Sequence, residues 1–171
     1  MTTYVWPPKS LDGYALVHAY TDVLGWRLFV GTEPVRPGEV EDAFVHNPST
    51  VVLAACAEFD AVSVPRKAAT EALVRLDRKG KVVPCLLHGD TGTFLAARGT
   101  GPCASMLPGV QVTAGRDARI ILPPTIGARW DTPPWHPSER APLELPSARV
   151  LRSFLGEGLR LYGLGEMGVR P

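Results

Sequence analysis

The stretch EFDAVSVPRKAAT, residues 58–70, reads as a buried strand that runs into a helix. Enzymes often keep metal-binding acids where such a strand ends, but this strand end carries Ser63 and Pro65, which bind no metal. Ser63 has no histidine–aspartate partner motif that would make it a nucleophile, and it could equally help to cap the helix. The stretch therefore has the strand-to-helix junction of a metal site but not the acidic residues that would bind the metal.

The cysteines and histidines do not follow a metal-ligand pattern. No Cys-x-x-Cys pair occurs, and the histidines have no ligand spacing, so we expect no zinc site or disulfide framework. The residues concerned are Cys56, Cys85, Cys103, His18, His46, His88 and His136. Free thiols that are buried in a reducing cytosol are the expected state.

Two other stretches resemble functional motifs only superficially. The sequence HGDTGT, residues 88–93, has neither the spacing nor the lysine of a phosphate-binding loop, so we interpret it as a hairpin turn. Asp90 and Asp117 are expected in turns, where aspartate bonds the local backbone. Trp130 and Trp135 could stack on bases, but among so many prolines they more often anchor a loop.

Basic side chains surround one predicted helix and one predicted turn. The helix cluster consists of Arg66, Lys67, Arg75, Arg78, Lys79 and Lys81, diluted by Glu71 and Asp77. It is either a helix face exposed to solvent or a basic edge that contacts successive phosphates of a nucleic-acid backbone. Arg116 and Arg119 flank a turn in the same way, and they could grip a phosphate or simply lie on the surface.

The elements that would position these residues follow from hydrophobic periodicity and breaker residues. Helices are predicted over residues 10–24, near 40–46, over 65–79 and from Ser147 onward. Strands are predicted over 26–30, 49–55, 59–64, 82–87 and 93–98, with a further strand pair over 110–124 that turns at 114–117. The Pro-rich segment 126–147 is expected to be ordered by packing Trp130 and Trp135 onto the body. The pattern predicts a single α+β domain over residues 1–171, with a central mixed or antiparallel sheet flanked by helices.

Composition limits the function classes. The chain has 171 residues, 45% of them hydrophobic and 20% charged, with a net charge of +1, as in an ordinary globular domain. Any affinity for nucleic acid must come from a local basic patch, because the overall charge does not supply it. Neither a signal peptide nor a run long enough to span a membrane is visible, so we expect a cytoplasmic protein without a membrane partner.

The order of these elements resembles the N-terminal catalytic domain of bifunctional DNA primase/polymerases, in the archaeo-eukaryotic primase superfamily. Four stretches carry the resemblance over roughly residues 11–136: YALVHAYTDVLGWRLFVG, HNPSTVVLAACAEFDAVSVP, LPGVQVTAGRDARIILPPT and GARWDTPPW. The third stretch, similar to the family's third motif and the hairpin after it, is the most specific. The chain looks most like short, stand-alone actinobacterial members that have no helicase half.

The resemblance implies where catalytic residues would lie. Active members use two aspartates two residues apart on a strand end, a third acid on a neighbouring strand and a histidine for the incoming triphosphate, with two divalent ions. On this chain the aspartate pair falls on Ser63 and Pro65, the third acid on Gln111 and the histidine near Thr93. His88 lies across the hairpin turn from Thr93 and is a poor substitute by register.

None of the four positions keeps its catalytic residue type. Asp60 is a possible substitute, but it precedes Ser63 by an odd offset, which places it on the opposite face unless a bulge intervenes. We therefore expect a primase/polymerase-like domain without metal-binding carboxylates, with no cofactor unless it is active, in which case Mg²⁺ or Mn²⁺ is needed.

Three functions remain open at this stage. The first is a non-catalytic protein that binds a nucleotide or single-stranded or duplex DNA, with Arg66, Lys67, Arg116 and Arg119 as phosphate contacts. The second is an active primase/polymerase with rearranged ligands. The third is a protein-interaction or regulatory module with a vestigial cleft, which would take a protein partner.

Overall fold

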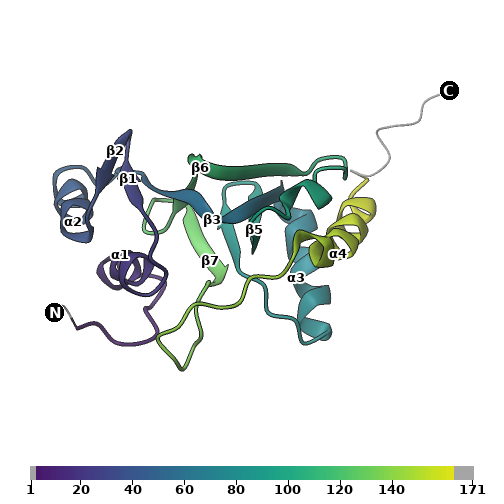
Figure 1. Cartoon of the computed structure of the whole chain (residues 1–171), viewed down its shortest axis with the longest axis horizontal. Helices are drawn as coiled ribbons and strands as arrows, with labels where there is room; N and C mark the ends of the chain where they lie inside the picture. The colour runs from purple at the N-terminus through teal and green to yellow at the C-terminus, as the bar shows by residue number, and fades with distance from the viewer. Residues whose placement is uncertain (1–2, 164–171) are drawn as a thin grey trace.

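A computed structural model describes residues 3–163, which form a single α+β domain with an antiparallel sheet (Figure 1). The helices are α1 (Gly13–Asp22), α2 (Pro37–His46), α3 (Arg66–Arg78), the short 3₁₀ helix η1 (Gly101–Cys103) and α4 (Ala148–Leu161). The strands are β1 (Leu28–Val30), β2 (Glu33–Val35), β3 (Val52–Pro65), β4 (Cys85–His88), β5 (Thr91–Ala97), β6 (Gln111–Leu122) and β7 (Ala128–Thr132). The predicted fold class is confirmed, and β2 lies in a segment that was predicted to be loop.

Strand β3 joins the two halves of the molecule. The sheet order is β2-β1-β3-β5-β4-β7, with β6 paired to β3 along its other edge, and every pair is antiparallel. The start of β3 lies beside β1, and its end lies beside β5. Helices α1 and α2 therefore belong to one half of the molecule, and α3 and α4 belong to the other (Figure 1).

Two strand predictions were wrong in the same way. The two strands predicted over 49–55 and 59–64 are parts of the single strand β3, which begins at Val52, and the strand pair predicted over 110–124 is replaced by the single strand β6. Strand β6 follows β3 from the Val52–Leu122 pair to the Ser63–Gln111 pair, with register shifts between them. Gly115, at φ +97°, lies at the irregularity, so its left-handed backbone makes a bulge rather than a chain reversal.

The sheet buries apolar side chains on both faces. Strands β3, β4 and β5 send Val62, Leu87 and Phe94 to the side covered by α3 and α4. Their alternate residues join a second core that includes Tyr20, Trp26, Phe59, Trp130 and Trp135. Trp130 Nε1 donates a 2.8 Å hydrogen bond to the Tyr20 hydroxyl inside that core.

The ends of the chain follow their local signals. The Asp12 carboxylate accepts a hydrogen bond from Ala15 N and caps α1, and the Ser147 hydroxyl accepts one from Arg149 N and caps α4. Helix α4 runs further than the predicted SARVLRSFL, to Leu161, and most of the tail beyond it lies outside the described residues. Within residues 3–163, no helix combines the length and the apolar character needed to cross a membrane.

Candidate functional site on one face of the sheet

Three of the four positions singled out by the resemblance meet at one point of the sheet. Ser63, near the end of β3, lies opposite Thr93 of β5 on one side and opposite Gln111 of β6 on the other. The Ser63 and Thr93 hydroxyl oxygens are 2.8 Å apart and share a hydrogen bond. Residues that are far apart in sequence therefore form one continuous polar row across three strands.

The same register places other polar residues beside this row. Pro65 follows Ser63 on the same face and lies opposite Thr91, which in turn lies opposite His88 of β4. Directly paired residues of antiparallel strands share a face, so His88 also belongs to it. Thr113 lies opposite Ala61 and extends the face along β6. We call Ser63, Pro65, His88, Thr91, Thr93, Gln111 and Thr113 the polar face.

The polar face is only partly open to solvent. Thr93 is 9% exposed, Ser63, Pro65, His88 and Thr113 are half-buried, and Thr91 and Gln111 are exposed. Its functional groups are hydroxyls, one amide and one imidazole, which can hydrogen-bond a phosphate or a base. None of its side chains is a carboxylate, and carboxylates are the ligands that a pair of Mg²⁺ ions requires.

His88 and Thr91 were not placed among the residues of this face from the sequence. His88 is displaced from Thr93 by two residue pairs along the hairpin, and it shares the face because β4 and β5 pair with His88 opposite Thr91. The two-residue turn at Gly89 and Asp90 fixes that register. Turn length and strand alternation in HGDTGT are the sequence signals that place both residues on this face.

Asp60 lies on the opposite face of β3 and makes a structural contact. Between Phe59 and Pro65 the pairing of β3 with β5 has no register shift, so Asp60 and Ser63 point to different sides. Asp60 is 2% exposed, and its carboxylate accepts a 2.7 Å hydrogen bond from Gly101 N at the start of η1. The side chain thus anchors η1 and does not reach the polar face.

The arginines and the lysine predicted to contact phosphate do not converge. Arg66 and Lys67 begin α3 directly after Pro65, but the Arg66 guanidinium donates to the Gly89 carbonyl at 3.0 Å. Arg119 donates to the Gly31 carbonyl, and its guanidinium carbon lies 3.8 Å from the centre of the Phe29 ring.

The two residues of this set that make neither contact are exposed. Lys67 is exposed in the first turn of α3, and Arg116 is exposed at the irregular part of β6. Arg119 lies opposite Ala55, at the other end of β3 from Ser63, so the predicted set is divided between the two ends of that strand. Only Arg66 and Lys67 lie beside the polar face.

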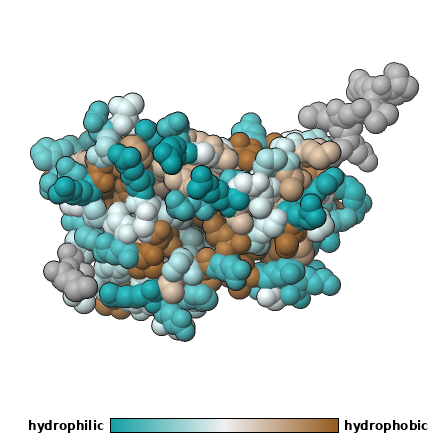
Figure 2. All heavy atoms as spheres, viewed as in Figure 1, coloured by the Kyte–Doolittle hydropathy of each residue, from teal (hydrophilic) through white to brown (hydrophobic). Residues whose placement is uncertain are grey.

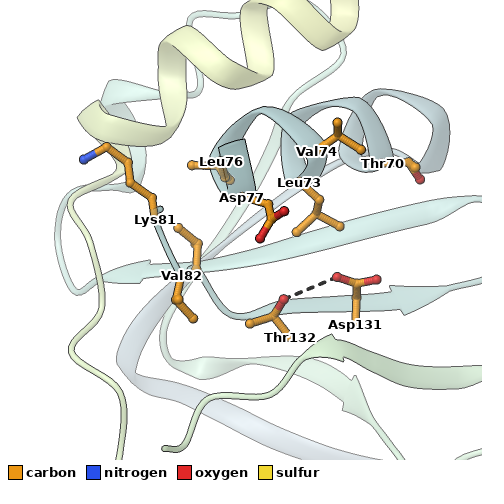
Figure 3. A pocket seen from close by; sticks show the side chains of 10 residues that line it. Thr70, Leu73, Val74, Leu76, Asp77, Lys81, Val82, Asp131 and Thr132 are labelled. Carbon is orange, nitrogen blue, oxygen red and sulfur yellow. Dashed lines mark hydrogen bonds between the residues drawn. The ribbon is translucent and has the colours of Figure 1, made fainter. Parts of the chain in front are cut away.

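A hollow of about 420 Å³ lies on the helical side of the sheet, between α3 and β7 (Figure 3). Leu73 and Asp77 of α3 point toward Asp131 and Thr132 of β7, and Lys81 lies at one end (Figure 3). Of the residues singled out from the sequence, Asp77 and Lys81 of the basic helix cluster line it, and no residue of the polar face does. Among the described residues no group of three or more histidine, cysteine or acidic side chains is placed to hold a metal ion, here or elsewhere.

The two fully buried thiols are poor nucleophiles. Burial, with a smaller effect from the Asp60 carboxylate, raises the pKa of Cys56 to about 12. Burial also raises the pKa of Cys85, with Asp131 acting in the same direction. Because the thiolate is the reactive form, both groups are inert in the folded protein near neutral pH. All three cysteines are free.

Comparison with known proteins gives no family model, no curated protein and no solved structure that matches this chain.

Proposed function

We propose that this chain is a non-catalytic domain that binds a nucleotide or a nucleic acid on a primase/polymerase-like scaffold. The observation that carries the proposal is the meeting of Ser63, Thr93 and Gln111 on one face of the sheet. These are the positions at which the resemblance would place catalytic groups, and separate strands bring them together in the fold.

The side chains at these positions favour binding over catalysis. Phosphoryl transfer of this type depends on metal ions that stabilise the charge of the reacting phosphates, and those ions need carboxylate oxygens. A hydroxyl, a second hydroxyl and an amide lie there instead, and the Asp60 carboxylate is held on the far side by Gly101 N. Hydroxyls and amides are common partners of phosphate oxygens and base edges.

The location that we propose is the cytoplasm. The support is the chemistry of the thiols: Cys56 and Cys85 are buried and unpaired, and Cys103 is also free, which is typical of proteins kept in a reducing compartment.

The test is a binding titration with opposite charge changes at one exposed position. Fluorescence anisotropy is measured with labelled single-stranded DNA and with a labelled nucleoside triphosphate, in EDTA, at low and moderate salt. Gln111→Lys should tighten binding and Gln111→Glu should weaken it by several-fold, because a phosphate nearby responds to either charge. Ser105→Glu, at an exposed position beyond η1, is the control.

Two outcomes would contradict the proposal. Equal affinities for Gln111→Lys and Gln111→Glu would show that no ligand phosphate lies near the polar face. Template-directed extension of a primer by the wild-type protein with Mg²⁺ or Mn²⁺ would show that the domain is catalytic.

A further inference from the structure

The positive charge of the chain is concentrated in two helical segments. Residues 66–81 contain six lysines and arginines against two acidic residues, and residues 148–161 contain three arginines against one glutamate. These segments together carry +6, whereas the whole chain carries +1, so the remainder carries −5. A nearly neutral protein thus has one strongly basic part.

The fold brings the two basic segments together. Helices α3 and α4 pack against each other, and Gly158 near the end of α4 lies against Ala68 at the start of α3. A Cβ at Gly158 would come within 2.6 Å of the Ala68 carbonyl oxygen, so the glycine permits this close approach. The C-terminal end of α3 also lies beside α4, because residues 75–79 and residues 153–157 line the same groove.

A groove of about 380 Å³ runs between the two helices at this end. Arg75, Arg78 and Lys79 line it from α3, and Ser153, Phe154 and Glu157 line it from α4. A separate hollow of about 350 Å³ lies between Lys81, Val82 and the start of α4, and Glu144 also lines it. In Figure 2 hydrophilic side chains dominate the outer rim of the molecule at the α4 end.

Most of the cations around this groove are uncompensated. Arg75 pairs with Glu71 at 2.8 Å, and Arg160 pairs with Glu157 at 2.9 Å. Apart from Arg66 and Lys67 at the far end of α3, the two segments contain five further basic residues, all exposed and in no ion pair within residues 3–163: Arg78, Lys79, Lys81, Arg149 and Arg152. We call these five residues the α3–α4 basic face.

We propose that the α3–α4 basic face binds the phosphodiester backbone of a nucleic acid. The inference rests on the proposed function for its class of ligand, but it places the backbone on the helical side of the sheet, away from Ser63. Five unpaired cations on two adjacent helix ends match a row of phosphates, and the guanidinium groups of three of them fit phosphate oxygens. An acidic peptide helix is less well matched, because such a helix docks its apolar face into a hydrophobic groove. Phe154 is the one large apolar side chain that lines this groove.

The experiment compares two variants with the same change in net charge. Arg78→Glu combined with Arg149→Glu alters the α3–α4 basic face, and Lys9→Glu combined with Arg36→Glu alters exposed cations in the N-terminal half. Anisotropy titrations use labelled 20-nucleotide single-stranded DNA, the corresponding duplex and labelled polyglutamate, at 50 and 200 mM salt. We expect the first variant to lose at least tenfold in affinity for DNA and to show a shallower salt dependence, with the control close to wild type.

The outcomes separate this inference from the proposed function. Equal losses in both variants would show a response to net charge alone and would overturn the inference. A loss of binding in Gln111→Glu but not in Arg78→Glu with Arg149→Glu would overturn it and leave the proposed function standing. The reverse pattern would support the α3–α4 basic face and remove the polar face from the proposal. Polyglutamate binding as tight as DNA binding would overturn the choice of nucleic acid.

Discussion

The Ser63 hydroxyl lies 2.8 Å from the Thr93 hydroxyl, across the boundary between β3 and β5. Either hydroxyl can donate to the other, so the two side chains are bonded without a charged partner and one O–H remains able to donate to a ligand. Gln111 lies opposite Ser63 on the third strand and remains exposed. The centre of the polar face is thus uncharged and internally bonded, and its outer edge is available to a ligand.

The register predicts that a cation site can be installed on this face. Ser63→Asp combined with Gln111→Asp should create two facing carboxylates, because paired residues of antiparallel strands have Cα atoms about 4.5–5.5 Å apart. We expect Mn²⁺ to bind at least tenfold more tightly than to wild type by isothermal titration, and to raise the melting temperature of this variant alone.

The control for that variant carries the same charge in a different arrangement. Ser63→Asp with Ser105→Asp places the second carboxylate beyond η1, on an exposed loop. Mn²⁺ binding as tight in this control as in the paired variant would show that residues 63 and 111 do not face each other.

Asp60 is predicted to contribute to stability and not to metal binding. Asp60→Ala leaves Gly101 N without its 2.7 Å partner in a buried position, and it should lower the free energy of unfolding by about 2–3 kcal/mol. Asp60→Asn keeps an acceptor oxygen for Gly101 N and should lower the free energy of unfolding by less than Asp60→Ala does. Urea unfolding in EDTA and in Mg²⁺ should give the same loss, whereas a loss that appears only with the metal would assign Asp60 to a cation site.

Two glycines of α4 should respond in opposite directions to the same substitution. Gly158→Ala places a methyl group 2.6 Å from the Ala68 carbonyl oxygen, which forces α3 and α4 apart and should cost about 1–3 kcal/mol. Gly156→Ala meets only Leu107 Cδ2, at 3.8 Å, and should stabilise the helix by up to about 1 kcal/mol. Thermal unfolding of the two variants measures both effects. Destabilisation of similar size in both would argue against the close helix contact.

Alkaline pH should destabilise the fold through its buried acidic groups. The pKa of Cys56 is about 12 in the folded protein, against an ordinary value of 9.0, because burial penalises the thiolate. Between these values the unfolded chain releases the proton and the folded protein retains it. The contribution of the Cys56 thiol to the free energy of unfolding is therefore fully present below about pH 9 and is lost as the pH rises toward 12. Burial raises the pKa values of Cys85 and Tyr20 in the same direction.

The contribution of Cys56 is isolated by substitution. Urea unfolding of wild type and Cys56→Ala at intervals between pH 8 and 11 should show a shallower decline for the variant. The comparison uses the slope of the free energy of unfolding against pH. The absolute stabilities differ for another reason, because the substitution also removes buried volume. Parallel curves for the two proteins would contradict the assignment.

Local sequence determined the helices and the hairpin. The apolar stripe of Ala69, Ala72 and Leu76 predicted α3, and HGDTGT predicted the turn between β4 and β5, because periodicity and turn residues act within a few positions. The resemblance selected Ser63, Thr93 and Gln111 as residues of interest. Their types predicted that these positions carry no carboxylates, which the sequence shows directly, and the absence of catalysis stays a prediction.

Only the tertiary structure decided which residues meet. The continuity of β3 and β6 depends on the pairing between them, which no local pattern contains, and it converts a predicted hairpin into one long irregular strand. The same pairing sets Gln111 beside Ser63 and carries Arg119 away to Gly31 and Phe29. The packing of α3 on α4 brings two modest basic segments together, because segments distant in sequence share a surface only when the chain folds back on itself.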